Sequence, residues 1–282
     1  LPRTLLCIAV GGILGLCGAV MQGLFRNPLA DPGIIGVSGG AALGAALAIV
    51  LLAPLGQQLQ SLLGLGLLPL LAFLGGALTT TLVYLLGTRE GGTSVTVMLL
   101  AGVAITALSG AVIGLLTYLA DDQMLRNLSL WQMGSLAAGK PVDVALALLT
   151  LATLLLLFAR DANPLNALLL GEGEARHLGV NVQALKRRLI LLTAAGVGVA
   201  VAVAGMIGFV GLVVPHLVRL LAGPNHVRLL PLSALLGAAL LLGADMLART
   251  LLAPAEMPVG IITALMGAPF FIWLLVKSRR PL

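Results

Sequence analysis

Residues 96–119 read TVMLLAGVAITALSGAVIGLLTYL, a run of 24 residues without a charged side chain. About 20 apolar residues in a helix cross the hydrocarbon core of a bilayer, whereas the strands of a membrane barrel alternate in polarity over about 10 residues. Only helices and closed barrels satisfy their backbone hydrogen bonds in lipid. The run therefore predicts a membrane-spanning helix.

The rest of the chain has the same character. Of its 282 residues, 60% are hydrophobic and 9% are charged, against roughly 25% charged residues in an ordinary soluble domain. The mean hydropathy of +1.13 agrees, so the composition excludes a soluble globular protein. The 36 glycines and the 4% of aromatic residues predict helices that approach closely through small side chains. Cys7 and Cys17 share one apolar run and are interpreted as packing residues.

Nine apolar runs, separated by charges, prolines or glycine clusters, are candidate spans. They predict an all-α, polytopic membrane bundle of about nine helices, with residues 1–282 forming a single transmembrane domain. The runs are approximately Leu5 to Gly23, Ile34 to Ala53, Leu63 to Leu86, Thr96 to Leu119, Val142 to Phe158, Leu189 to Ala204, Ile207 to Leu221, Leu230 to Leu247 and Val259 to Val276.

The distribution of basic residues predicts the orientation of the chain. If the chain starts outside the cell membrane, 12 of the 16 Lys and Arg residues fall in inner loops, and only Arg3, Arg126, Lys140 and Arg249 fall outside. Short inner loops are enriched in Lys and Arg, so the bias indicates an outer start and a cytoplasmic C-terminus. The inner residues are Arg26, Arg89, Arg160, Arg176, Lys186, Arg187, Arg188, Arg219, Arg228, Lys277, Arg279 and Arg280. These charges are scattered and are not interleaved with stacking aromatics, so the net charge of +6 indicates no nucleic-acid partner.

One stretch has the spacing of a phosphate-binding loop, because Gly134 is followed by Gly139 and Lys140 as G-x-x-x-x-G-K. Such a loop needs Ser or Thr at the next position to bind magnesium, and it needs a preceding strand on the cytoplasmic side. Here Pro141 follows and the segment is predicted to lie outside. The chain is therefore expected to bind no ATP.

A second stretch, Gly36 to Gly40, matches G-x-S-x-G. With Ser38 as nucleophile and His216 as base, it would make an intramembrane serine protease. The alternative is a small-residue turn in which Ser38 bonds a backbone carbonyl, and the number of spans favours it. His216 could also ligate iron, but a single His after the helix-kinking Pro215 is more often part of an unwound turn.

The longest hydrophilic stretch, residues 160–188, is predicted to be cytoplasmic. Its sequence indicates two short amphipathic helices separated by Gly179. Charged helices joined by a glycine would form a knob for a soluble partner. Because the chain lacks an ATP site, a separate motor subunit is a reasonable expectation.

On the outer side, Asp245 precedes Arg249 by four residues, which places both side chains on one helix face. An ionisable residue at this depth is either functional or simply neutralised by a local ion pair, and the sequence leaves both interpretations open. Arg3 and Arg249 are isolated positive charges on an otherwise apolar face. Such charges suit the docking of an acidic soluble partner.

Five long motifs, in order along the whole chain, resemble the permease subunits of type II ABC importers, which take up ferric siderophores, haem and vitamin B12. The motifs are QGLFRNPLADPGIIGVSGG at 22–40, LLAGVA at 99–104, LGEGEARHLG at 170–179, GMIGFVGLVVPH at 205–216 and PVGIITALMGAPFFI at 258–272. The first motif contains the G-x-S-x-G match, so the resemblance also accounts for that stretch.

The resemblance implies a homodimer of ten-span subunits in a bacterial inner membrane, with two ATPase subunits below and a periplasmic substrate-binding protein above. ATP and Mg would bind to the ATPase, and no cofactor or metal would bind to this chain. The opening Leu-Pro-Arg resembles the start of the family's second span, which implies that the first span is absent from this sequence. Haem is the favoured cargo because the sequence looks most like haem permeases, and a ferric siderophore or vitamin B12 stays open.

The resemblance also implies roles for particular residues. It implies that the ATPase-coupling segment includes Glu172, Glu174, Ala175, Arg176, His177, Leu178 and Gly179. It implies that Arg3 and Arg249 dock the binding protein. It implies a cytoplasmic gate in the loop Gly91 to Thr96, with Thr93, Ser94, Val95 and Thr96 as its residues, and a path lined by the spans Thr96 to Leu119 and Val259 to Val276.

Overall fold

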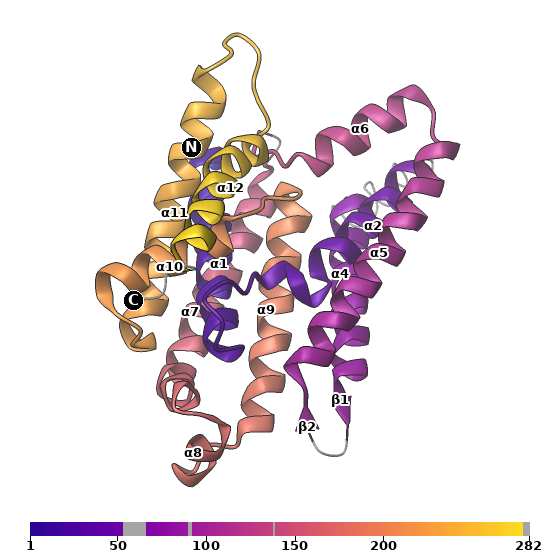
Figure 1. Cartoon of the computed structure of the whole chain (residues 1–282). Coiled ribbons are helices and arrows are strands. Elements are labelled where there is room, and N and C mark those ends of the chain that lie inside the picture. Colours follow the sequence, from indigo (N-terminus) through magenta and orange to yellow (C-terminus); the bar gives the residue numbers. More distant parts are fainter. Residues whose placement is uncertain (53–65, 90–91, 138, 279–282) are drawn as a thin grey trace.

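The computed structural model describes residues 1–52, 66–89, 92–137 and 139–278, and in these ranges the chain is a helical bundle with one short hairpin (Figure 1). The elements are α1 (Pro2–Leu24), the 3-10 helix η1 (Pro32–Ile35), α2 (Val37–Val50), α4 (Leu67–Gly87), β1 (Thr88–Arg89), β2 (Gly92–Thr93), α5 (Val95–Leu119), α6 (Asp122–Gln132), α7 (Pro141–Leu169), α8 (Glu172–His177), α9 (Val182–Ala204), α10 (Val210–Ala222), α11 (His226–Thr250) and α12 (Val259–Ser278).

The apolar helices confirm the predicted all-α membrane bundle. Within the described ranges, six helices are long and apolar enough to span a bilayer, and α2, α10 and α12 are shorter apolar helices. Together they coincide with the nine predicted runs. Ala53 and residues 63–65, where two of those runs were expected to end and begin, lie outside the described residues.

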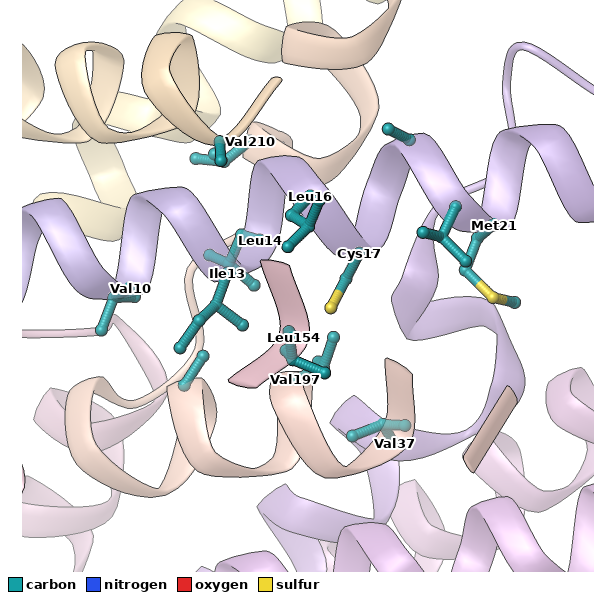
Figure 2. Close-up of a cluster of buried hydrophobic side chains, with 14 of the residues drawn as sticks. Val10, Ile13, Leu14, Leu16, Cys17, Met21, Val37, Leu154, Val197 and Val210 are labelled. Atoms are coloured by element: carbon teal, nitrogen blue, oxygen red, sulfur yellow. The ribbon is translucent and has the colours of Figure 1, made fainter. Parts of the chain in front are cut away.

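The core of the bundle surrounds α1, which packs against α7, α9, α10 and α11. The helix is buried on all sides from Ala9 to Leu24, and Leu154 of α7 and Val197 of α9 lie near Ile13 and Cys17 (Figure 2). Both cysteines are free and buried, as their interpretation as packing residues predicted.

A second group of helices, α2, α4 and α5, packs together and is joined to the first group by α9, which contacts both α1 and α4. Gly40 and Gly44 of α2 face Gly75 and Leu71 of α4 so closely that a Cβ on any of the three glycines would overlap backbone atoms. Small residues therefore set the spacing between these helices, as the glycine content predicted.

The prediction for residues 160–188 was partly wrong. The segment begins inside α7, which continues past Phe158 to Leu169, and the expected second short helix is the first part of the long helix α9. At about 1.5 Å per residue, the 29 residues of α7 exceed the roughly 30 Å hydrocarbon core. The extension carries the buried Asp161, whose carboxylate accepts from Arg188 Nε at 2.9 Å and also from its Nη2. This ion pair lets a charged segment stay helical against α9.

The ends of the bundle differ in character (Figure 1). The helix α8 and the β1–β2 hairpin lie at one end, called here the α8 end. The helix α6, which the sequence analysis did not anticipate, and the connection from α11 to α12 lie at the opposite end.

Candidate functional site

The helix α8 has sharp boundaries at both ends. Gly171 has a positive φ of 122°, which ends the path of α7, and Gly179 has a φ of 82°, where a glycine avoids a steric penalty. The first turn carries Glu172 and Glu174, and the last turn carries Arg176 and His177, so the charges complement the helix dipole. These features confirm a short, charged helix ahead of Gly179.

One face of α8 is anchored and the other is open. Ala175 is buried in the core cluster, so the helix is seated firmly on the bundle. Leu178 is 64% exposed and Leu170 is 67% exposed, and an added Cβ at Gly173 or Gly179 would meet nothing within 4 Å. The segment predicted for ATPase coupling therefore offers the exposed Leu178 beside charged side chains, and the exposed Leu170 lies just before it.

The predicted gate residues form a corner between the hairpin and α5 and not an open loop. Thr93 ends β2 and pairs with Thr88, and Val95 and Thr96 form the first turn of α5. Ser94 is the N-cap, and its hydroxyl accepts from the N–H of Val97 at 3.5 Å. Its own N–H donates to the carbonyl of Gly87 at 2.8 Å. Four residues of the expected loop are therefore held by a hairpin and a helix cap, which are both local motifs; Gly91 lies outside the described residues.

The coupling segment and the gate corner, predicted separately, are brought together by α9. Lys186 binds Glu172 of α8 and the carbonyl of Thr93. From the sequence, Lys186 was expected only to be one of the basic residues of the inner loops. A signal was present, because Leu185, Lys186, Leu189 and Ile190 share the buried stripe of α9 at helical spacing. A cation within an apolar stripe indicates a buried partner.

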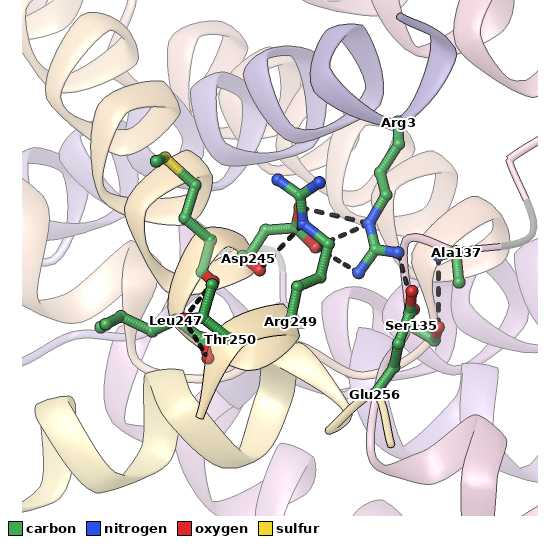
Figure 3. A network of polar contacts seen from close by, with 9 residues as sticks. Arg3, Ser135, Ala137, Asp245, Leu247, Arg249, Thr250 and Glu256 are labelled. Atoms are coloured by element: carbon green, nitrogen blue, oxygen red, sulfur yellow. Dashed lines mark hydrogen bonds and ion pairs between the residues drawn. The ribbon is translucent and has the colours of Figure 1, made fainter. Parts of the chain in front are cut away.

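At the opposite end, Asp245 is 1% exposed and is held by two arginines (Figure 3). Arg3 of α1 approaches it at 2.8 Å, and Arg249, one turn further along α11, approaches it at 3.2 Å. Arg3 also binds Glu256, in the connection to α12, at 2.7 Å. Of the interpretations left open for Asp245, the structure shows the local ion pair with Arg249. The expectation that Arg3 and Arg249 are isolated charges was wrong, because the buried carboxylate of Asp245 binds both, although Arg3 lies 242 residues away along the chain.

The residues of the protease alternative are placed on separate elements. Ser38 lies in the first turn of α2 and His216 lies in α10. The His216 ring packs edge-on against Phe270 of α12, with ring centroids 6.0 Å apart, and its Nδ1 has no hydrogen-bond partner among the described residues. Ser38 and His216 therefore form no nucleophile–base pair through this nitrogen.

A polytopic helical bundle with a short charged helix at one end is consistent with a membrane transport permease. The chain belongs to the FecCD transport family, whose model matches residues 1–277. It is the permease subunit of an ABC importer that works with ATPase and substrate-binding components, and ATP hydrolysis lies in the separate ATPase subunits. The chain is thus a multi-pass transport subunit and not an enzyme, which excludes the protease.

Named relatives agree with this class. The hemin transport system permease protein HmuU of Yersinia pestis is 50% identical, over 99% of this chain and 82% of its own length. The vitamin B12 import system permease protein BtuC of Citrobacter koseri is 45% identical, over 99% of this chain and 82% of its own length.

Solved structures share the fold. A metal-chelate type ABC transporter in an inward-facing conformation superposes with a TM-score of 0.87 at 37% identity, and the match covers 98% of this chain and 85% of that one. A chain of PsaBC from Streptococcus pneumoniae superposes with a TM-score of 0.68 at 20% identity, over 96% of this chain and 88% of that one, which shows a similar fold alone.

Proposed function

We propose that this permease imports haem from the periplasm to the cytoplasm across a bacterial inner membrane, by alternating access driven by ATP in its partner subunits. The observation that carries the choice of cargo is the 50% identity to a hemin permease over almost the whole chain. A ferric siderophore or vitamin B12 would use the same mechanism, and the 45% identity to a vitamin B12 permease keeps that cargo as a test outcome.

The working assembly in this proposal contains two copies of the chain, two ATPase subunits and one periplasmic binding protein. The α8 end faces the cytoplasm, since the basic residues concentrate in the loops of that side. The exposed Leu170 and Leu178, which flank α8, support contact with the ATPase, because apolar side chains beside charged ones outside the membrane suit a protein interface.

The translocation path in this proposal is lined by α5 and α12 at the contact between the two copies. The exposed leucines and valines along α5 and the exposed Leu265, Met266 and Ile272 of α12 support an apolar path. The gate lies at Thr93 to Thr96, where α5 begins. Rigid-body rocking of the helices, driven through α8, would open this end as the other closes.

The function is tested by uptake of haem into proteoliposomes that contain the permease with its ATPase and haem-loaded binding protein. We expect uptake that requires ATP. A permease that copurifies with an active ATPase but takes up no haem would move the cargo to a ferric siderophore or vitamin B12. Failure to copurify with any ATPase would contradict the proposed assembly.

Docking of the binding protein through Arg3 and Arg249 is part of the proposal, and Arg249 is the better candidate. Its side chain is 43% exposed and contacts only Asp245 among the described acids, whereas Arg3 is 22% exposed and holds both Asp245 and Glu256. Arg249 can therefore offer donors to a carboxylate of the partner without leaving Asp245 unpaired.

Arg249→Gln is expected to weaken docking of the binding protein roughly tenfold, as is typical of a charge pair at an interface worth about 1.4 kcal/mol. The affinity is measured by surface plasmon resonance at low salt. Arg126→Gln is the matched control, because Arg126 is exposed on α6 at the same end and the change in charge is equal. Equal affinities of the two variants would exclude Arg249 from the docking surface.

A further inference from the structure

The side chain of Lys186 lies at the junction of three elements at the α8 end. It is in the second turn of α9, and its residue is only 2% exposed. Its Nζ donates to Glu172 Oε1 of α8 at 2.6 Å and to the carbonyl oxygen of Thr93 in β2 at 3.0 Å. One ammonium group thus bonds the coupling helix and the gate corner at the same time.

A second side chain of α9, that of Gln183, also binds the backbone of β2. Gln183, one turn before Lys186, accepts the N–H of Thr93 at 3.0 Å, so both backbone polar groups of Thr93 are bound by α9. Gly92 permits this approach, since it has a φ of 113° and an added Cβ would lie 2.9 Å from Gln183 Cδ. The strand β2 is therefore held by side chains of α9 as well as by its pairing with β1. Figure 1 shows the N-terminal end of α9 between α8 and the hairpin.

A buried ammonium makes this junction sensitive to movement. A charge removed from water is costly unless each of its hydrogen bonds is made, and truncating one partner leaves the other unsatisfied. If α8 moves away from the bundle, Lys186 either loses its carboxylate or follows it and releases Thr93. An apolar side chain at this position would fill the space without linking the two contacts.

We propose that Lys186 is a positioning residue that transmits displacement of α8 to the gate corner, through its simultaneous bonds to Glu172 and Thr93. This inference rests on the proposed function, because it takes α8 as the coupling helix and Thr93 to Thr96 as the gate. The inference adds Lys186, a residue that lies outside both α8 and the gate corner. The Lys186 side chain is the direct route by which the state of the ATPase reaches the gate.

The test uses a single reactive cysteine at the gate. Cys7 and Cys17 are both buried, so Ser94→Cys gives one exposed thiol for maleimide labelling in the assembled transporter. The labelling rate is measured without nucleotide and with ATP in an ATPase subunit that binds but does not hydrolyse it. With Lys186 present, we expect the two rates to differ at least fivefold. With Lys186→Met, we expect the complex to assemble and the ratio of the two rates to fall below about twofold.

Two further variants keep the test decisive. Arg187→Met removes an equal charge from the adjacent exposed position and should leave the ratio unchanged. Glu172→Ala removes the acceptor on α8 and leaves the bond to Thr93, so it should lower the ratio even if Lys186→Met does not fold. A ratio in Lys186→Met or in Glu172→Ala equal to that of the Ser94→Cys transporter with Lys186 and Glu172 intact would overturn the role of Lys186. No ATP response with Lys186 intact would instead overturn the proposed gate.

Discussion

Gly18→Ala is expected to prevent normal packing of α1 against α10 and to lower the free energy of unfolding by about 3 kcal/mol or more. A Cβ at Gly18 would overlap the carbonyl oxygen of Gly211 and lie 2.6 Å from its carbon and 2.7 Å from its Cα. All three are backbone atoms, so no rotamer change can relieve the clash and the two helices must separate. The better helix propensity of alanine, worth about 1 kcal/mol, acts in the opposite direction and is the smaller effect.

The effect is measured by thermal unfolding and by size-exclusion chromatography of the detergent-solubilised permease. Gly243→Ala is the matched control, since Gly243 is inside α11 and a Cβ there would meet nothing within 4 Å. We expect the control to unfold at or slightly above the temperature of the unmodified protein, because alanine has the better helix propensity. A Gly18→Ala variant as stable as the control would show that α1 and α10 are not in close contact in the solubilised permease.

The apolar helices could be predicted from the sequence because each contains an uninterrupted apolar run, and six of the runs in the described residues are long enough to cross a bilayer. The end of α7 could not be predicted, because the charges after Phe158 resemble a loop. Their helical state depends on the ion pair of Asp161 with Arg188 in α9, a tertiary contact that no local pattern contains.

The candidate sites show the same distinction. The charged composition of α8 and its glycine boundaries are local, so that helix was predictable. Asp245 and Lys186 each have one partner close in sequence, Arg249 and Glu172, and one distant partner, Arg3 and Thr93, which lie 242 and 93 residues away. The spacing along one helix pointed to Arg249, but it could not identify the distant partners. Contacts between charges on different helices therefore cannot be predicted from the spacing of residues along one helix.

Leu178→Glu is expected to weaken association with the ATPase about 100-fold, which corresponds to about 3 kcal/mol. In the proposed assembly, Leu178 enters the interface from the exposed face at the end of α8, while Ala175 anchors the opposite face. A carboxylate buried there would lack a partner and would add to the negative charge of Glu172 and Glu174. The association is measured by copurification and by titration of ATPase activity against permease concentration.

The contrast with other exposed leucines decides whether this effect is specific. Leu252→Glu introduces the same change at a position 57% exposed, in the connection from α11 to α12 at the opposite end, and should leave association with the ATPase intact. Leu178→Met preserves apolar contact and should lie within about threefold of the unmodified protein. If Leu178→Glu still copurifies with a fully active ATPase, the exposed face of α8 is not the coupling surface, and the contacts of Lys186 with Glu172 would then hold α8 in place without transmitting a signal from the ATPase.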